Sequence, residues 1–340
     1  MRKLIIQIPC FEEAEHLPVT LGDLPRAVPG FERVEWLVVD DGSTDGTAEA
    51  ASRGGVDHVV RLSRHRGLAR AFTEGLEASL RLGADVIVNV DADNQYRADD
   101  IVHLVAPILR GDADMVVGAR PIDDISHFSP LKKALQRLGS RVVRMASGTD
   151  VPDATSGFRA LSREAARRLH VFSEYSYTLE TIIQAGWKGL AVASVPVRVN
   201  PDLRPSKLVT SLPAYLRRQL LTILRIFVTY RPFFFFASLG AVAFGAGFLL
   251  GLRFLYFYLT EGGGGHVQSV ILASLLLGSG LALGLIGLVA DLVSVNRKLL
   301  EEVEWRVQRL EISEVTPVER ADRDASAYGE SGSGSVAVPE

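Results

Sequence analysis

The sequence has few of the groups on which several kinds of protein depend. It holds a single cysteine, Cys10, among 340 residues, so no internal disulfide can form, which suits a reducing compartment. Its net charge of −3 gives no reason to expect a nucleic-acid partner. The 7 histidines show no metal-ligand spacing. We therefore expect neither a disulfide framework, nor nucleic-acid binding, nor a histidine metal centre.

The N-terminus also lacks the apolar core of a secretory signal. After Met1-Arg2-Lys3, only a short run of apolar and amide residues precedes Pro9. That run is shorter than the apolar region of a signal peptide. We expect any catalytic part of the chain to stay in the cytoplasm.

Strand and helix patterns alternate over the first 200 residues. We expect strands at 4–8 (stopped by Pro9), 36–39, 56–62, 85–90, 115–117 and 190–199, and helices at 12–24, from about 45 (capped by Ser43 or Thr44), 67–82, 99–109, 129–147, around 163–168 and 177–187. The expected strands are apolar on both faces, which is typical of a parallel sheet covered by helices on both sides. The fold class is therefore α/β, Rossmann-like, with a mostly parallel sheet.

Polar side chains gather where three of the expected strands end. They lie in Pro9–Glu13, in Asp40-Asp41 and in Asp91–Gln95. Ligands of open α/β sheets bind beyond the carboxyl ends of the strands. One crevice can therefore hold all three segments.

The segment after the fourth expected strand carries Asp91, Asp93 and Gln95, which alternate along the chain. In an extended segment they project from the same side. Three oxygen ligands suit Mg²⁺ or Mn²⁺, which takes further oxygens from water or a diphosphate. The same residue types also favour a solvated acidic turn or a helix N-cap.

Two long apolar runs, 233–252 and 269–290, each reach the length that a bilayer requires. Basic residues flank the pair on one side, at Arg217, Arg218, Arg225, Arg231, Arg297 and Lys298. The positive-inside rule then predicts a two-span protein of the cell membrane with the N-terminal domain and both termini in the cytoplasm.

The chain therefore divides into five predicted parts. These are a cytoplasmic catalytic domain at 1–206, a basic amphipathic interfacial helix at 207–231 (otherwise a core helix), a membrane hairpin at 232–294, a short charged helix at 295–312 and a disordered tail at 313–340. The charged helix has a short heptad-like pattern, so a homo-oligomer through it and the membrane helices is possible.

Four motifs follow one another in order: Pro9-Cys10-Phe11-Glu12-Glu13, Val39-Asp40-Asp41-Gly42-Ser43-Thr44-Asp45, Asp91-Ala92-Asp93-Asn94-Gln95 and Ser156-Gly157-Phe158-Arg159. This order resembles family 2 glycosyltransferases with a GT-A fold. With the hairpin, the chain is most similar to the polyprenyl-phosphate glycosyltransferases, the group of dolichol-phosphate mannose synthase and its bacterial relatives. The resemblance covers about residues 3–295.

The resemblance implies a role for each matching residue. Pro9, Phe11, Glu13, Asp40, Asp41 and Asp91 would bind the nucleotide; Asp91, Asp93 and Gln95 the metal; Asp93, Arg120 and Arg159 would act in catalysis; and Arg204, Ser206 and Lys207 would bind the acceptor phosphate. The chain departs from the family at Phe11-Glu12, where Tyr-Asn is common, and at His65-Arg66-Gly67, where Asn-x-Gly is common. Neither departure removes a metal ligand.

The implied reaction is an inverting transfer of a sugar from a UDP- or GDP-sugar to undecaprenyl or dolichyl phosphate. A lipid monophosphate has a second pKa of about 6 and is already nucleophilic at neutral pH, so no general base is required. The alternatives are a glycosyltransferase acting on a sugar hydroxyl, or an inactive nucleotide-sugar-binding scaffold. No tryptophan lies in the Gln-x-x-Arg-Trp pattern of processive synthases, and the intact acidic triplet disfavours a scaffold.

Overall fold

A computed structural model describes residues 2–121, 130–169, 171, 177–201, 224–225, 228, 230–262 and 267–315. The chain forms two compact units, Met1–Phe235 and Phe236–Glu340, and each is described by itself. Several predictions lie outside the described residues, namely the acceptor-phosphate residues Arg204, Ser206 and Lys207, most of the interfacial helix and the tail beyond residue 315.

The first unit is built on a sheet with the strand order β3-β2-β1-β4-β6-β5-β7. The strands are β1 (Lys3–Cys10), β2 (Arg33–Asp40), β3 (His58–Arg61), β4 (Val86–Asn89), β5 (Met115–Ala119), β6 (Arg159–Ser162) and β7 (Val192–Pro196). β6 runs antiparallel to both neighbours, and the other pairs are parallel. This mostly parallel sheet confirms the predicted fold class.

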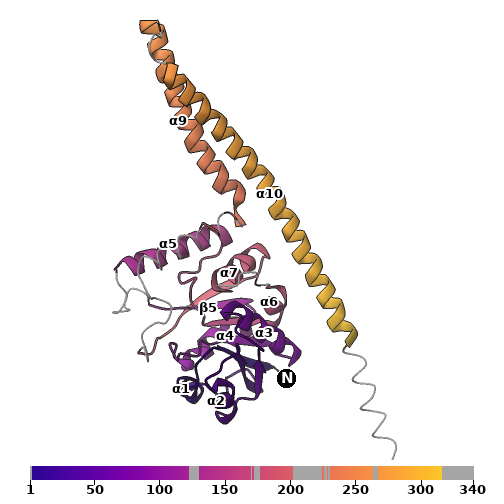
Figure 1. Cartoon of the computed structure of the whole chain (residues 1–340). Coiled ribbons are helices and arrows are strands. Elements are labelled where there is room, and N and C mark those ends of the chain that lie inside the picture. The colour runs from indigo at the N-terminus through magenta and orange to yellow at the C-terminus, as the bar shows by residue number, and fades with distance from the viewer. Residues whose placement is uncertain are drawn as a thin grey trace, which may run out of the picture. The chain divides into compact units, whose positions relative to one another are not determined.

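Helices cover both faces of the sheet (Figure 1). They are α1 (Leu17–Asp23), α2 (Thr47–Arg53), α3 (Leu68–Arg81), the 3-10 turn η1 (Ala98–Asp100), α4 (Ile101–Arg110), α5 (Pro130–Ser147), α6 (Arg163–Arg168) and α7 (Tyr177–Trp187). One core packs Phe72 of α3 and Ile183 of α7 against Ile5 of β1. The other packs Leu17 of α1 and Leu104 of α4 against the opposite face. Successive β1 residues thus serve the two cores alternately.

The prediction that the first strand stops at Pro9 is wrong. β1 continues and pairs Pro9 with Val39 and Cys10 with Asp40 of β2. Its pairing with β4 ends at Gln7, whose carbonyl accepts from the β4 side. The backbone groups of alternate strand residues point to the same side, so the nitrogen of Pro9 faces the β4 side, as that of Gln7 does. Because β4 no longer pairs with β1 at this position, the N–H that Pro9 lacks is not required there.

The prediction of a helix from Glu12 is also wrong, because α1 begins at Leu17. Glu12 has a φ of 54°, which is left-handed and ends any helical run. The N–H of Glu12 donates to Ser43 Oγ, and that of Glu13 donates to Thr47 Oγ1. Residues 12–13 therefore join β1 to the loop after β2, a long-range contact that outweighs their local helix preference.

Two smaller differences concern α2 and β6. Neither Ser43 nor Thr44 caps α2, which begins at Thr47 after a left-handed Gly46; instead, Asp45 Oδ1 accepts from the Thr47 N–H. β6 was not predicted, because its four residues begin at Arg159, the last residue of the fourth motif, and show no distinct apolar alternation. Its pairing partners are β4 and β5, distant in sequence.

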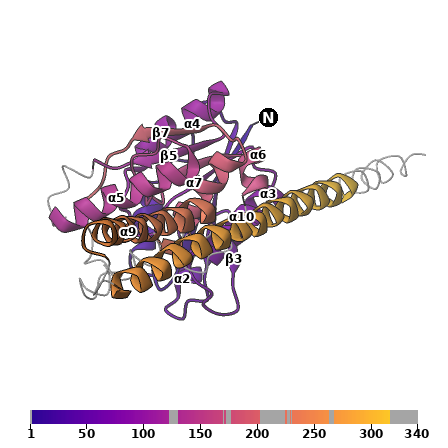
Figure 2. The same ribbon diagram turned by 90° about the horizontal axis from the view of Figure 1, so that it is seen from above.

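The second unit is an antiparallel pair of helices, α9 (Pro232–Glu261) and α10 (Val267–Val315), which lie side by side in both views (Figures 1 and 2). α10 is continuous through the predicted charged helix 295–312. Both helices contain stretches long and apolar enough to cross a membrane, Pro232–Thr260 and Val267–Asn296. Most large apolar side chains on them are exposed, unlike those of a core helix in a soluble protein.

The two helices meet along a line of small residues. A Cβ at Gly240 would lie 2.7 Å from the Gly280 carbonyl oxygen, and the reverse distance is also 2.7 Å. A Cβ at Gly247 would lie 2.9 Å from the Ala273 carbonyl oxygen. The backbones therefore approach closely, as small residues allow in helix pairs of membranes.

Candidate active site

The three polar segments meet at one edge of the sheet, as predicted. The N–H of Asp41 donates to the Cys10 carbonyl at 2.9 Å, which ties the loop after β2 to the end of β1. Thr20 Oγ1 of α1 donates to the Ala92 carbonyl at 2.7 Å, which ties the loop after β4 to the same region. The parallel strands β2, β1 and β4 are adjacent, so their carboxyl ends lie at one edge of the sheet, where ligands of such sheets bind.

Asp41 is held by backbone donors. Its Oδ1 accepts from the Arg66 N–H at 2.8 Å, its Oδ2 accepts from the Gly67 N–H at 2.8 Å, and His65 Nδ1 lies 2.8 Å from Oδ2. The carboxylate is buried, and its donor Gly67 directly precedes α3. In this structure Asp41 therefore fixes the loop before α3 to the end of β2.

Asp40 and Glu13 are buried in the same region. Asp40 Oδ1 accepts from the Ser43 N–H at 2.9 Å, and Arg61 Nε lies 3.4 Å from Oδ2. Glu13 Oε2 lies 3.6 Å from His16 Nδ1. The predicted nucleotide-binding acids are thus brought together, and each already has a protein partner.

The side chains of Phe11 and His65 form an aromatic pair in the same loops as these acids. The rings of Phe11 and His65 lie 3.8 Å apart between centroids, and Phe11 is 39% exposed. The His65 ring is fixed by Asp41. Sequence reasoning gave His65 no role, although its place in the Asn-x-Gly position was a signal. Two exposed rings in contact, tilted by 31°, offer a surface that suits a planar base.

Asp91, Asp93 and Gln95 are each partly exposed, whereas Ala92, Asn94 and Tyr96 between them are buried. The alternation predicted from the sequence is therefore present, although the left-handed Asn94, with φ of 55°, turns the segment. The N–H of Gln95 donates to Asp93 Oδ1 at 3.2 Å. The three oxygen-bearing side chains share one side of the loop.

The Asp91 carboxylate accepts no hydrogen bond from the described residues. Burial and the neighbouring Asp93 carboxylate raise the pKa of Asp91 to about 7, although Arg120 and Arg159 oppose the rise. A Cβ at Gly157 would lie 2.6 Å from both Asp91 carboxylate oxygens. The chain thus places a glycine against a carboxylate that is not compensated by hydrogen-bond donors.

This donor set fits a divalent cation of the Mg²⁺ or Mn²⁺ kind. Within the described residues no three His, Cys, Asp or Glu side chains gather closely enough to hold a metal ion by themselves. Mg²⁺ commonly binds through one or two carboxylates and completes its shell with water and substrate phosphates. Asp91 and Asp93, with the Gln95 amide oxygen, can supply that protein share.

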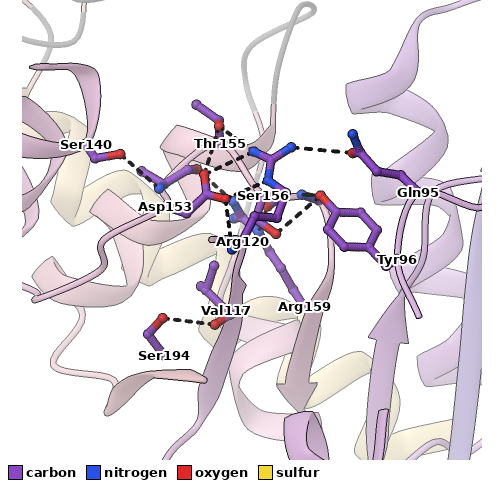
Figure 3. A network of polar contacts seen from close by, with 12 residues as sticks. Gln95, Tyr96, Val117, Arg120, Ser140, Asp153, Thr155, Ser156, Arg159 and Ser194 are labelled. Carbon is purple, nitrogen blue, oxygen red and sulfur yellow. Dashed lines mark hydrogen bonds and ion pairs between the residues drawn. The ribbon is translucent and has the colours of Figure 1, made fainter. Parts of the chain in front are cut away.

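Arg120 stands at the centre of a buried polar network (Figure 3). Its Nε and Nη2 donate to Asp153 at 2.7 and 3.1 Å, Nη2 also donates to Thr155 Oγ1 at 2.9 Å, and Nη1 reaches Gln95 Oε1 at 3.4 Å. Burial alone would raise the pKa of Asp153, but the Arg120 guanidinium holds it below its usual range. Sequence reasoning found Arg120 but not Asp153, which orients it.

Arg159 has different partners from the predicted phosphates. Its side chain is fully buried and donates to the carbonyls of Ala154, Ser156 and Thr178 and to Thr181 Oγ1. Burial lowers the pKa of Arg159 to about 10. These bonds join the 154–157 loop to α7, so in this structure Arg159 orders the loop that carries Gly157.

The chain matches the model of one protein family, described as glycosyl transferase family 2, over residues 5–169. It is 32% identical to an undecaprenyl-phosphate mannosyltransferase of Micrococcus luteus over 61% of this chain and 88% of that protein. It is 32% identical to a UDP-N-acetylglucosamine–dolichyl-phosphate N-acetylglucosaminyltransferase of Methanococcus voltae over 56% of this chain and 83% of that protein. A glycosyltransferase of Haloferax volcanii, AglJ, is 28% identical over 88% of this chain and 96% of its own length.

Among solved structures, the chain is similar to glucosyl-3-phosphoglycerate synthase from Mycobacterium tuberculosis. The structure of that enzyme with Mn²⁺, uridine diphosphate and glucosyl-3-phosphoglycerate superposes with a TM-score of 0.53 at 20% identity and covers 67% of this chain and 80% of that one. At this identity the likeness supports the fold and no more.

Proposed function

The chain belongs to glycosyl transferase family 2, and from that premise we propose that it transfers a hexose from a UDP- or GDP-sugar to a polyprenyl phosphate such as undecaprenyl or dolichyl phosphate. The observation that carries the acceptor is the similarity along 88% of an undecaprenyl-phosphate mannosyltransferase. The two exposed apolar helices α9 and α10 support it, since a lipid acceptor requires an enzyme at the membrane.

The diphosphate of the donor would lie against the loop after β4. Asp91, Asp93 and Gln95 would hold a divalent metal there, and such a metal neutralises the charge that develops on a leaving diphosphate. The Asp91 carboxylate, which accepts no hydrogen bond from the described chain, is the site observation behind this assignment. Gly157, which leaves room beside that carboxylate, keeps the position open to a ligand.

The nucleoside would lie over the loops after β1 and β2. The Phe11–His65 pair would offer its rings to the base. The rest of the nucleoside would lie against Pro9, Glu13, Asp40 and Asp41. Because Asp41 is already bonded to two backbone N–H groups, it would act by holding His65 and the loop. The replacement of the family's Asn-x-Gly by His65-Arg66-Gly67 places a ring at this position.

Arg120 would contact the phosphates of the donor, and Arg159 would position the loop beside them. The Nε and Nη2 groups of Arg120 are fixed by Asp153, whereas Nη1 makes only a long contact of 3.4 Å with Gln95. The N–H groups of Nη1 can therefore donate to a phosphate oxygen, a contact for which arginine is well suited. The Arg159 guanidinium instead donates hydrogen bonds to backbone carbonyls of the protein.

The acceptor monophosphate would attack the anomeric carbon directly. It is largely a dianion at neutral pH, so the chain need not provide a general base. Displacement of the nucleoside diphosphate from the opposite face inverts the anomeric configuration. Arg204, Ser206 and Lys207, which lie outside the described residues, remain the predicted contacts of the acceptor phosphate.

We place the catalytic unit and both termini on the cytoplasmic side of the cell membrane. The basic residues before α9 and within α10 beyond its apolar stretch support this orientation through the positive-inside rule. Fluorescein maleimide labelling of a cysteine introduced at exposed Ser52 in right-side-out vesicles tests it. Labelling before permeabilisation would contradict the orientation.

The proposed reaction is tested with membranes that contain the chain, a panel of radiolabelled UDP- and GDP-hexoses, and undecaprenyl or dolichyl phosphate. We expect a chloroform-extractable labelled lipid with at least one donor, and no such lipid after EDTA treatment. A labelled water-soluble glycan without labelled lipid would favour the alternative, transfer to a sugar hydroxyl. Asp93→Asn should abolish the transfer without loss of folding; full activity in that variant would contradict the proposed metal site.

A further inference from the structure

Two polar side chains lie in the core beneath the carboxyl ends of β1 and β4. Gln7 of β1 and Asn89 of β4 are paired across the two strands, and both are fully buried. One pair earlier, the same face of the sheet carries Ile5 and Ile87, because alternate strand residues share a face. The face that packs against α3 and α7 therefore changes from apolar to polar as these strands approach the site.

The side-chain amide of Asn89 is hydrogen-bonded at both ends. Its Oδ1 accepts from Gln7 Nε2 at 2.9 Å, and its Nδ2 donates to the Gly157 carbonyl at 2.9 Å and to Tyr177 Oη at 2.9 Å. The hydroxyl of Tyr177, the first residue of α7, donates to the same Gly157 carbonyl at 3.4 Å. Two buried side chains thus hold the carbonyl oxygen of Gly157.

A second tyrosine holds the N–H of Gly157, which donates to Tyr96 Oη at 3.3 Å. Tyr96 is buried, and its ring stacks on Phe158 with centroids 5.0 Å apart. Tyr177 is also buried, and its ring stacks on Phe72 with centroids 3.9 Å apart. Because both rings are fixed by packing, their hydroxyls anchor the two peptide groups that flank Gly157.

The anchored glycine lies against the Asp91 carboxylate. A Cβ at Gly157 would lie 2.6 Å from both Asp91 carboxylate oxygens, so the backbone at this position limits the orientations that the carboxylate can adopt. Asp91 accepts no hydrogen bond from the described residues. Its direction therefore depends on packing against Gly157.

The polar pair in the core is not the choice that stability alone would favour. Gln7 Oε1 is buried and has no hydrogen-bond partner among the described residues, which costs stability relative to an apolar pair such as Ile5 and Ile87. Departures of this kind from an apolar core are expected where a site has to be supported. The residue that this polar pair reaches is Gly157.

We propose that three buried side chains, Asn89, Tyr96 and Tyr177, are positioning residues of the metal site. They hold Gly157, which keeps the Asp91 carboxylate in the direction that a divalent cation requires. The proposal rests on the metal site of the proposed function and deepens it. Without these anchors the carboxylate would gain orientations that do not bind the cation, so metal affinity would fall, as it does when the partners that orient a metal ligand are lost.

Mn²⁺ binding tests the proposal in the full chain, purified in detergent, from the electron paramagnetic resonance signal of free Mn²⁺. Tyr96→Phe and Tyr177→Phe each remove one hydroxyl and keep the ring, and Asn89→Leu removes the amide at similar size. We expect the Kd for Mn²⁺ to rise roughly tenfold in Asn89→Leu and several-fold in each tyrosine variant. Tyr230→Phe is the matched control, because it removes a buried hydroxyl that is bonded to Glu180 instead, and its Kd should not change.

A double-mutant cycle separates positioning from a general loss of stability. In Gly157→Ala the added methyl already displaces the Asp91 carboxylate, so Tyr177→Phe should raise the Kd less in that background than in the natural chain. An effect that adds in full would contradict a route through residue 157. Thermal unfolding of each variant gives the folded fraction, and the two tyrosine variants decide the outcome if Asn89→Leu does not fold. An unchanged Kd in these variants, or an equal rise in Tyr230→Phe, would overturn the proposal.

The Mn²⁺ titration does not depend on transfer activity. If the variants bind Mn²⁺ more weakly than the natural chain, the positioning role stands even where no labelled lipid forms. If labelled lipid forms while the Kd is the same in every variant, the positioning role is wrong and the reaction is retained. A natural chain that binds no Mn²⁺ would overturn the metal site and the positioning role together.

Discussion

Asp41 and Asp91 follow neighbouring parts of the sheet, yet the chain treats their carboxylates in opposite ways. Asp41 lies just beyond β2 and accepts hydrogen bonds from two backbone N–H groups and a contact from His65. Asp91 lies just beyond β4, accepts no hydrogen bond from the described residues and faces a glycine. Both lie at the same edge of the sheet, so position alone does not decide their roles.

The difference indicates that Asp41 has a structural role (the frame of the site) and that Asp91 has a role in binding a ligand. A buried carboxylate that is fully hydrogen-bonded stabilises the fold, whereas one that is not hydrogen-bonded destabilises it unless a ligand compensates the charge. Asp41 thus belongs to the frame, and Asp91 is kept for a cation. The same contrast holds between Arg159, whose bonds go to protein carbonyls, and Arg120, whose Nη1 makes only a long contact.

Asp91→Asn should give the largest effect on activity. Loss of a charged metal ligand should lower transfer at least about a hundredfold, while the melting temperature of the metal-free protein stays equal or rises, because an uncompensated charge is removed. Lipid-linked product formation and thermal unfolding in detergent measure the two effects. A large loss of stability would mean that Asp91 belongs to the frame.

Asp41→Asn should show the opposite pattern. Asparagine offers one acceptor oxygen where the carboxylate accepts two backbone N–H groups, so the folding free energy should fall by about 2–3 kcal/mol. The activity of the folded fraction should change only a few-fold. Chemical or thermal unfolding measures the loss, with the exposed Asp112→Asn as a control of about 0.5 kcal/mol or less. Lost donor binding at unchanged stability would instead make Asp41 a nucleotide ligand.

Gly157→Ala should have a smaller effect confined to Asp91. The added methyl group would lie 2.6 Å from both carboxylate oxygens, and the short Asp91 side chain must rotate away. We expect transfer to fall roughly tenfold, the order seen when the support of a metal ligand is lost, with a higher Mn²⁺ concentration for half-maximal rate. Gly22→Ala, where no atom lies within 4 Å, is the matched control and should leave the rate unchanged.

The pH dependence of stability should give the smallest effect. Burial and Asp93 raise the pKa of Asp91 to about 7, so the metal-free folded chain binds a proton more tightly than the unfolded chain, whose carboxyl pKa is about 4. That contribution is present below the unfolded pKa and is lost as pH rises through about 7. The melting temperature in EDTA should fall by several degrees from pH 5 to pH 8 relative to Asp91→Asn. An identical profile in the variant would contradict the raised pKa.

Much of the fold could be predicted because its signals are local. The apolar runs of β1, β2 and β4 and the face of α3 were found from periodicity, and the parallel topology then brought three loops to one edge. The errors arose where distant contacts decide the conformation. Glu12 looks helical by composition, but its N–H is taken by Ser43, so its conformation depends on a loop 31 residues later.

The site was predictable at the level of loops and less so at the level of atoms. The alternation of Asp91, Asp93 and Gln95 is visible in the sequence. The burial of Arg159 is not, because its partners Thr178 and Thr181 lie on α7, far along the chain. The pairing of Arg120 with Asp153 likewise depends on the antiparallel β6, which brings the fourth motif back to the sheet.

The close approach of α9 and α10 has a consequence for how copies of the chain could associate. Gly240, Gly247 and Gly280 face the partner helix of the same chain, so these three small residues already serve the packing within one hairpin. The outer surface of the hairpin carries phenylalanine, leucine and valine side chains, together with Gly245, Gly251, Gly278 and Gly284, at which a Cβ would meet no neighbouring atom within 4 Å. The close packing of α9 against α10 is therefore complete within one chain and does not require a second copy.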